Sequence, residues 1–313
     1  MTKKTPGVSV VMSVFNGEAH VATAVESILN QSYRDFEFII VDDGCTDSTP
    51  EVLRSFKDPR ITMVTQSNRG LAVALNKGIA KSKGRYIARM DSDDIAVHTR
   101  LETQYRFLED NPGIGLVGTW IRIVDDKGNV LRQTKEPVGS SEIRKGMATY
   151  NCFNHGTVMF RRSIFDKAGG YSTTFPESVP VEDYALWLRM LKYCEGANIP
   201  EYLYLWRQHA ASTSSTQRQK QAEQFFLVSE AYIKSKIVEL EKRDGGNDEL
   251  AFYHYCLGKI HHHHRGTDSR KHLKTALRLD PFVAPKAYWY LGLSFVNNKL
   301  ADKIRRLRDS FLM

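Results

Sequence analysis

The sequence of 313 residues lacks several features that define large classes of proteins. No apolar run approaches the roughly 20 residues that a membrane-spanning helix needs. The first residues contain no apolar core of the kind found in secretory signal peptides, which favours a cytoplasmic location. The four cysteines lie far apart and form no Cys-x-x-Cys pair. This spacing argues against a zinc ribbon or a disulfide framework and fits a reducing compartment.

Two common phosphate-binding signatures are also missing. The first strand-like run, residues 8–15, is followed by neither a Gly-x-Gly-x-x-Gly sequence nor a Walker-type loop. Dinucleotide binding and P-loop chemistry are therefore disfavoured. The composition is otherwise that of an ordinary globular protein, with 42% hydrophobic and 26% charged residues.

The net charge of +8 is unevenly distributed along the chain. Lysine and arginine exceed aspartate and glutamate by only one over residues 1–216, but by seven over residues 217–313. A change in charge balance of this size indicates two functional parts. We therefore predict two domains, residues 1–216 and a basic helical domain at residues 217–313.

Apolar, β-branched runs alternate with helix-like segments over the first domain. The strand-like runs are residues 8–15, 36–41, 61–64 and 85–89, and the helix-like segments are residues 18–30, 47–56, 71–80 and 99–108. Such alternation is typical of βαβ units in an open, mostly parallel sheet flanked by helices. The fold class is therefore predicted to be α/β, with an all-helical C-terminal segment.

Polar residues follow three of these strands, where ligands bind in open α/β sheets. They are Phe15-Asn16, Asp42-Asp43 and the acidic run Asp91-Ser92-Asp93-Asp94. Three unpaired carboxylates are costly to bury, whereas a hard divalent cation takes oxygen ligands readily. The acidic run therefore predicts a metal site, with a solvated acidic turn as the alternative.

Six short motifs together resemble glycosyltransferase family 2, whose members have the GT-A nucleotide-sugar-binding fold. In order they are Ser13–Glu18, Val41–Thr49, Asn68-Arg69-Gly70, Asp91-Ser92-Asp93, His155-Gly156-Thr157 and Glu182-Asp183. The resemblance spans roughly residues 8–210, and Cys45 replaces a serine that is usual in the second motif. The membrane helices and the Gln-x-x-Arg-Trp motif of processive synthases are missing. The resemblance is therefore to the non-processive enzymes, which add a single sugar.

The resemblance implies a UDP-sugar site at the strand ends. Its expected nucleotide-binding residues are Phe15, Asn16, Glu18, Asp43, Asn68, Arg69, Asp91 and Arg207. A carboxylate such as Asp43 can accept the imide N–H of uracil. Judged from the residues alone, the alternative for Asp42-Asp43 is a turn followed by a helix cap, and the alternative for Arg69 is a surface arginine.

The same resemblance implies Mn²⁺ or Mg²⁺ as cofactor. Asp91 and Asp93 correspond to the family's Asp-x-Asp pair, and His209 lies where relatives often place a metal ligand. The cation would neutralise the charge that develops on the departing diphosphate. Asp94 is expected to cap the next helix.

Asp183 is the expected general base of an inverting transfer, which would take the proton of the acceptor hydroxyl. Glu182 and Asp183 could instead be acids that complement the dipole of a helix. His155 is expected near the acceptor, with a buried structural histidine as the alternative.

The C-terminal part ends in an amphipathic, basic helix over residues 299–313, which could contact the inner face of a membrane or pack on its own domain. The tract His261–His264 is expected at a helix end. This helical part is also a natural surface for a homo-oligomer.

The sequence thus predicts an inverting transferase that moves one sugar from a UDP-sugar to a carbohydrate or lipid-linked acceptor in surface-polysaccharide assembly. One alternative is a sugar-1-phosphate nucleotidyltransferase, although the acidic loop after the first strand is unsuited to a triphosphate. Another is a non-catalytic nucleotide- or polyanion-binding scaffold. Nucleic acid is not expected as a partner, because no aromatic residues alternate with the basic ones of the last helix.

Overall fold

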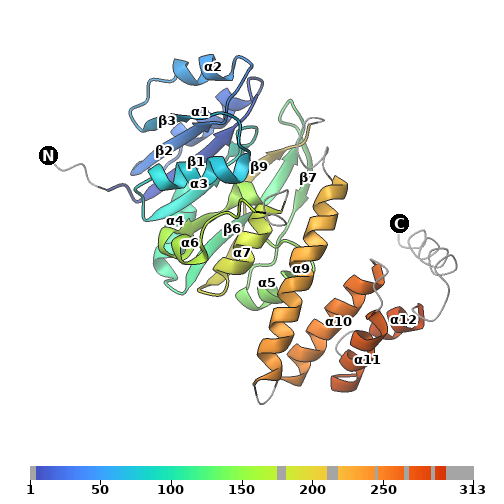
Figure 1. The fold of residues 1–313 in the computed structure, drawn as a ribbon. Coiled ribbons are helices and arrows are strands. Elements are labelled where there is room, and N and C mark those ends of the chain that lie inside the picture. The colour runs from blue at the N-terminus through green and yellow to red at the C-terminus, as the bar shows by residue number, and fades with distance from the viewer. Residues whose placement is uncertain are drawn as a thin grey trace. The chain divides into compact units, whose positions relative to one another are not determined.

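The structure is a computed structural model that describes residues 5–174, 181–209, 218–243, 246–263, 268–282 and 286–293. The chain divides into two compact units, Met1–Phe225 and Phe226–Met313 (Figure 1). Helix α9 (Arg218–Glu241) contains the boundary between them. The sequence-based division between residues 216 and 217 stays a prediction.

The first half of unit 1 is a parallel sheet. Its strands are β1 (Val8–Val14), β2 (Phe36–Asp42), β3 (Ile61–Thr65) and β4 (Tyr86–Met90). The helices between them are α1 (Val21–Leu29), α2 (Thr49–Ser55) and α3 (Leu71–Lys81). The strands pair in the order β3-β2-β1-β4, which confirms the predicted βαβ units.

The second half makes the sheet mixed. It adds β5 (Ile95–Ala96), β6 (Ile114–Val124), β7 (Val130–Thr134), β8 (Met159–Arg161) and β9 (Glu195–Arg207). Strand β8 is antiparallel to both β4 and β6, whereas β9 is parallel to β6. Residues 155–160 also look like a strand in the sequence, but the first half of that prediction is wrong, because η1 (His155–Thr157) forms a 3₁₀ turn before β8.

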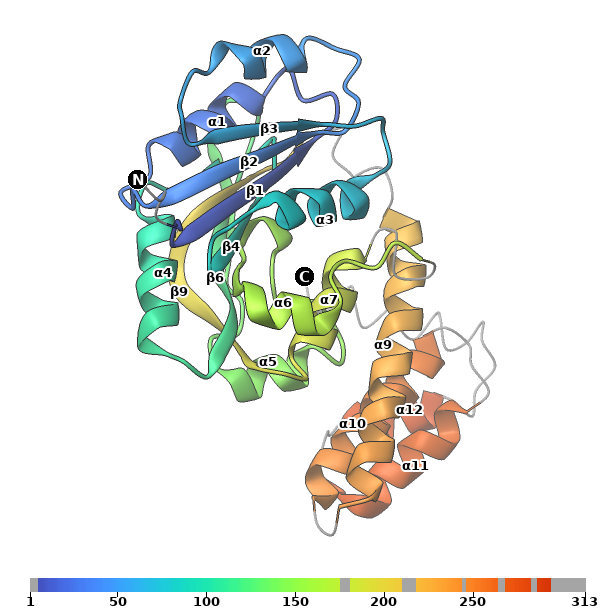
Figure 2. The same cartoon turned by 60° about the vertical axis from the view of Figure 1, so that its left-hand side comes forward.

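Helices cover both faces of the sheet (Figure 2). The remaining ones of unit 1 are α4 (Arg100–Asp110), α5 (Ser140–Gly146), α6 (Arg162–Ala168) and α7 (Glu182–Met190). Side chains alternate between faces along a strand. Val10, Met12, Ala88 and Met90 accordingly join the core that includes α1 and α4. The other side chains of β1 and β4, Arg89 among them, point to the opposite face, where α3 lies.

Unit 2 is helical. After α9 it contains α10 (Asn247–His263), α11 (Ser269–Leu279) and α12 (Lys286–Leu293). Ile233, Ile237 and Leu240 form a buried apolar stripe along α9. His261, His262 and His263 are the last described residues of α10, and His264 lies outside the described residues, so the expected helix end stays a prediction.

The basic helix expected over residues 299–313 lies outside the described residues, and its contact with a membrane stays a prediction. Within the described ranges, no helix combines the length and the apolar character needed to cross a bilayer.

Two histidines form a close pair inside unit 2. The Nδ1 atoms of His254 and His272 are 2.9 Å apart, so one ring must donate a proton and the other must accept it. Burial lowers the pKa of both rings, that of His272 to about 4. The other charged groups that act on them are Glu241, His261, Asp268, Lys271 and Arg278.

We expect this pair to make unit 2 sensitive to acid. The pKa of His272 is lower in the folded chain than the roughly 6.5 of an unfolded chain, so the unfolded state binds more protons between these values. Stability should therefore fall as the pH drops from about 6.5 to about 4. Thermal melts followed by circular dichroism should show a smaller fall in His272→Asn than in the wild type. The exposed His98→Asn is the control, and an identical fall in all three proteins would refute the prediction.

Candidate active site

The loops after β1 and β2 are joined by side-chain hydrogen bonds. Asn16 has a φ of 51°, a conformation that asparagine tolerates better than most residues. Its Oδ1 accepts from the backbone N–H of Thr46 at 2.8 Å, and its Nδ2 donates to the Thr46 hydroxyl at 3.2 Å. Asn16 therefore holds two neighbouring strand ends together.

Glu18 makes a second connection between the same loops. Its Oε2 accepts from the backbone N–H of Ser48 at 2.9 Å, and its own N–H donates to Asp47 Oδ2 at 3.1 Å. One carboxylate oxygen of Glu18 is thus already used within the protein. Contact between Glu18 and a nucleotide stays a prediction.

Asp43 joins the loop after β2 to the one after β3. It is 2% exposed, and its carboxylate accepts from Gln66 Nε2 and from the backbone N–H groups of Arg69 and Gly70, at 2.7 to 3.0 Å. A carboxylate offers about four lone-pair sites, so these bonds leave room for one more donor.

Three residues around Asp43 face outward. Asn68 and Arg69 are exposed beside it. Phe15, at the end of β1, has 48% of its surface exposed, which is unusual for a phenylalanine and leaves a ring face available.

The turn formed by residues 91–94, the acidic turn, is fixed by β9. Arg207 is 4% exposed; its backbone N–H donates to Asp94 Oδ1 at 2.7 Å, and its Nε to the Asp93 carbonyl at 2.9 Å. Its Nη1 donates to the carbonyls of Asp125 and Asp126. The guanidinium thus holds the backbone of the acidic turn. Contact between Arg207 and the nucleotide stays a prediction.

The predicted role of Asp94 as a helix cap is wrong. Helix α4 begins at Arg100 with Thr99 before it and has no side-chain cap. Asp94 is 1% exposed, and burial together with the charge of Asp93 raises the pKa of its carboxyl. It stabilises the turn through Arg207 instead.

Asp93 and His209 come together from different ends of the unit. Asp93 Oδ2 lies 2.9 Å from His209 Nε2, and the His20 ring lies 5.4 Å from the His209 ring, centroid to centroid. Among the described residues no group of three metal-binding side chains is complete. Mg²⁺ and similar cations usually take one or two carboxylates plus phosphate and water, which Asp93 fits, and the imidazole of His209 is itself a common metal ligand.

Asp91 lies beside a buried arginine. Asp91 Oδ2 forms an ion pair with Arg89 Nη1, and its backbone N–H donates to the Tyr204 hydroxyl at 3.2 Å. Gly156 passes close by: a Cβ there would lie 2.2 Å from Tyr204 Oη and 2.7 Å from Asp91 Oδ2. Only glycine fits between these groups.

Two adjacent acids open α7. Asp183 Oδ2 accepts from Asn151 Nδ2 at 2.8 Å, and burial raises the pKa of its carboxyl. Burial and the charge of Asp183 raise the pKa of Glu182 as well. A base with a raised pKa binds a proton more strongly than an exposed aspartate does, which suits proton transfer.

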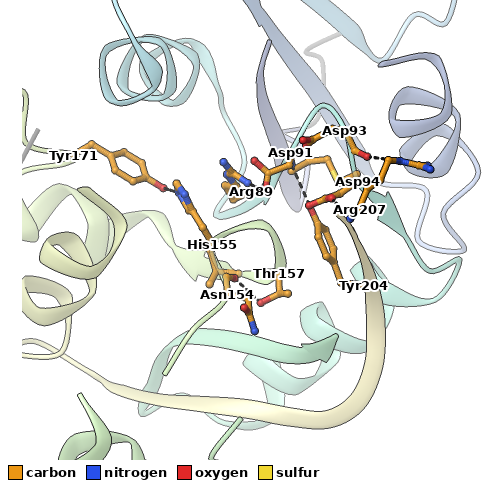
Figure 3. Close-up of polar contacts among 12 residues, drawn as sticks. Arg89, Asp91, Asp93, Asp94, Asn154, His155, Thr157, Tyr171, Tyr204 and Arg207 are labelled. Carbon is orange, nitrogen blue, oxygen red and sulfur yellow. Dashed lines mark hydrogen bonds and ion pairs between the residues drawn. The ribbon is translucent and has the colours of Figure 1, made fainter. Parts of the chain in front are cut away.

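His155 belongs to an aromatic cluster. Its Nε2 lies 2.8 Å from the Tyr171 hydroxyl, and its ring meets that of Trp187 edge-on at 5.8 Å. Burial, followed by the charge of Arg89, lowers the pKa of the ring. Figure 3 shows Arg89 between the His155–Tyr171 pair and the acidic turn. His155 has structural partners, and contact with an acceptor stays a prediction.

Three residues near the site were not predicted. Arg89 interrupts the otherwise uncharged strand β4, and that interruption was a usable signal. His20 immediately precedes α1, close enough to the end of β1 for the strand-end rule to include it. Nothing in the sequence indicated that Tyr204 lies near the site, because its position depends on the register between β9 and β6.

The sheet order and the polar strand ends define a GT-A type of nucleotide-sugar-binding fold. Solved structures with this fold are similar, although only 16% identical. *Staphylococcus aureus* TarS in complex with UDP-GlcNAc has a TM-score of 0.60 over 94% of this chain and 85% of that one. The mannosyltransferase PcManGT from *Pyrobaculum calidifontis*, with GDP-Man and Mn²⁺, has a TM-score of 0.60 over 99% and 82%.

The chain belongs to glycosyl transferase family 2, whose sequence model matches residues 9–169. It is 34% identical to the O-antigen biosynthesis glycosyltransferase WbnJ of *Escherichia coli*, over 81% of this chain and 96% of the relative. It is 30% identical to WfaP of *Escherichia coli*, a UDP-Glc:α-D-GlcNAc-diphosphoundecaprenol β-1,3-glucosyltransferase, over 73% and 88%. The protein is therefore a glycosyltransferase.

We expect Gly156→Ala to destabilise unit 1. The added methyl group would overlap Tyr204 and Asp91, and overpacking of this kind typically costs about 1–3 kcal/mol. Urea unfolding measures the loss. In the control Gly113→Ala the methyl group enters open space, and we expect a change within about 0.5 kcal/mol. Equal stability of the two variants would contradict the close approach.

Proposed function

We propose that this glycosyltransferase is an inverting enzyme that transfers one sugar from a UDP-sugar to a lipid-linked saccharide during the assembly of a surface polysaccharide. The observation that carries the proposal is the contact between Asp93 and His209 just after β4, at the same edge of the sheet as Phe15, because β1 and β4 run parallel. The proposed sites of donor, metal and base are those named from the sequence.

The donor half is supported by loops that are already in place. Phe15 offers an exposed ring on which a base can stack, and Asp43 keeps one lone-pair site for the imide N–H of uracil. Asn16, Glu18 and Asp43 hold the three loops together through internal hydrogen bonds. The nucleotide would therefore bind without much rearrangement, and Asn68 and Arg69 would contact it from the rim.

The diphosphate half is supported by the donor set of the metal ligands. A Mn²⁺ or Mg²⁺ ion at Asp93 and His209 would supply positive charge to the departing diphosphate. Asp91 lies two residues before Asp93. It would contact the ribose and, through a water molecule, the metal ion. Arg207 would act indirectly, because it fixes the backbone of Asp93.

The acceptor half is supported by Asp183. As the acceptor oxygen attacks the anomeric carbon, its proton passes to the Asp183 carboxylate, and the bond from that carbon to the diphosphate oxygen breaks on the opposite face. Asn151 fixes Oδ2 of this carboxylate through a hydrogen bond. His155 and Tyr171 would form the wall beside the acceptor.

The acceptor class is supported by the relatives. WbnJ acts in O-antigen biosynthesis, WfaP uses a diphosphoundecaprenol-linked acceptor, and AmsE of *Erwinia amylovora*, 31% identical over 62% of this chain, acts in amylovoran biosynthesis. Two of the three names describe polysaccharide biosynthesis, and the third describes a lipid-linked acceptor.

The first prediction from this proposal concerns the donor. Purified protein should release UDP slowly from one member of a panel of UDP-sugars with Mn²⁺ or Mg²⁺ present, and EDTA should stop the release. Asp93→Ala should lose it, because the cation loses its carboxylate ligand. Asp110→Ala, which removes an exposed carboxylate at the end of α4, should keep it. Release from GDP-mannose alone, or release unaffected by EDTA, would contradict the proposed donor or metal.

The second prediction concerns the base. Asp183→Asn should lower kcat by about 10²–10⁴-fold with little change in the Kd for UDP, because the base acts only on the acceptor. Glu182→Gln should lower kcat by a smaller factor than Asp183→Asn does. Since burial raises the pKa of Asp183, the acid limb of kcat/KM should lie above the roughly 3.9 of an exposed aspartate. An active Asp183→Asn beside an inactive Glu182→Gln would reassign the base.

A further inference from the structure

Strand β6 turns Trp120 and Arg122 away from the apolar core. Both side chains are partly exposed, whereas the residues that follow them, Ile121 and Ile123, are buried in the core that includes α1 and α4. Successive side chains of a strand alternate between its two faces, so Trp120 and Arg122 project from the opposite face of the sheet. Arg89 of β4 projects from that same face, because the residues on either side of it belong to the core.

The register of the sheet places Trp120 level with the acidic turn. Met159 of β8 pairs with Ala88 of β4 on one side and with Val117 of β6 on the other. Since β8 is antiparallel to both strands, β4 and β6 run in the same direction. Trp120 lies three residues beyond Val117, as far along β6 as Asp91 lies along the chain from β4. Two strand spacings, or about 10 Å, separate these positions, so the end of β6 lies beside the candidate active site.

Two cations lie over two aromatic rings at the end of β6. The Trp120 and Tyr202 rings are in contact, 5.4 Å apart from centroid to centroid. The Arg122 guanidinium carbon lies 5.1 Å from the centre of the Tyr202 ring. Lys135 Nζ lies 5.0 Å from the centre of the Trp120 ring. We call these four residues, Trp120, Arg122, Lys135 and Tyr202, the cation–aromatic row.

The cation–aromatic row is connected to the turn that contains His155. Trp120 Nε1 donates to the Glu136 carbonyl at 3.0 Å, and the Glu136 carboxylate accepts from Asn154 Nδ2 at 3.3 Å. Asn154 directly precedes His155 in η1. The row is therefore held in position beside the part of the molecule in which the proposed function places the acceptor.

The two cations of the row have aromatic partners but no acidic ones. Among the described residues, no carboxylate forms an ion pair with Arg122 or Lys135. The carboxylate of the neighbouring Glu136 is bonded to Asn154 instead. Guanidinium and ammonium groups both bind phosphate, and groups that are already held in place lose less entropy when a ligand binds. An anionic ligand with phosphate groups therefore complements the row.

We propose that the cation–aromatic row binds the diphosphate of a lipid-linked saccharide acceptor, with the saccharide extending from there over η1. Arg122 and Lys135 contact the phosphate oxygens. Trp120 and Tyr202 hold the two cations and present apolar surface beside them. This inference rests on the proposed function, which it deepens by naming residues that hold the acceptor. None of the four residues belongs to the proposed donor site.

Binding without turnover tests the row directly. The probe is the octyl diphosphate ester of α-N-acetylglucosamine, titrated by calorimetry into donor-free protein with EDTA, so that no metal ion attracts the diphosphate. Arg122→Gln and Lys135→Gln should each raise the Kd about tenfold, the change expected on losing one hydrogen bond to a charged group. Octyl N-acetylglucosaminide, which has no diphosphate, should not distinguish the variants from the wild type.

Arg132→Gln is the matched control. Arg132 of β7 pairs with Ile123 of β6, and paired residues face the same side, so it carries the same charge on the opposite face from Arg122. Its loss should change the Kd less than twofold. In the active enzyme, Arg122→Gln should raise the KM for the acceptor with little change in kcat, because the row acts on binding. The Kd for UDP with metal should stay that of the wild type.

The outcomes separate the row from the proposed function. A wild type that does not bind the probe, or equal losses in Arg122→Gln and Arg132→Gln, overturns the row as an acceptor site. Loss of probe binding in Arg122→Gln, in a protein that releases UDP from no donor, supports the row and refutes the proposed function. If Arg122→Gln instead binds phosphatidylglycerol vesicles less well and keeps its affinity for the probe, the cations serve a membrane surface and the inference is wrong.

Discussion

The contact between Asp94 and Arg207 fixes the site on which the rest of the catalytic unit depends. These residues are far apart in the sequence, yet the Arg207 backbone donates to the buried Asp94 carboxylate while its guanidinium binds the Asp93 carbonyl. The Arg207 guanidinium is charged, and hydrogen bonds from a charged group are worth more than neutral ones, particularly away from water. The acidic turn therefore keeps its shape although the carboxylates of Asp91 and Asp93 repel each other, and both can face a ligand.

The other acids of the site are also buried near few positive charges. Asp91, Asp94, Glu182 and Asp183 lie close to only a few buried cations, and the pKa values of the last three are raised by burial. Oriented groups of this kind stabilise a developing charge without reorganising during the reaction. Burying these groups lowers the free energy of unfolding, and the apolar core formed by β1, β2, β4, α1 and α4 offsets that loss.

Much of the fold could be predicted because local patterns carry it. The continuous apolar runs of β1 and β2 and the helices between them depend on periodicity and strand-end chemistry. The parts that could not be predicted depend on contacts distant in sequence. Asp94 looks like a helix cap until β9 brings Arg207 beside it. The need for glycine at position 156 becomes visible only once Tyr204 and Asp91 lie beside it.

The candidate site shows the same limit at the level of single residues. The motifs place Asp43, Asp93 and Asp183 at strand or helix ends, but they do not distinguish a side chain that faces a ligand from one that organises a loop. Asp43 accepts three internal hydrogen bonds, and Arg207 binds backbone carbonyls. We expect both the residues that face a ligand and the residues that organise a loop to tolerate substitution poorly, for different reasons. Loss of an organiser should move the Kd and the unfolding free energy together, whereas loss of Asp183 should change kcat alone.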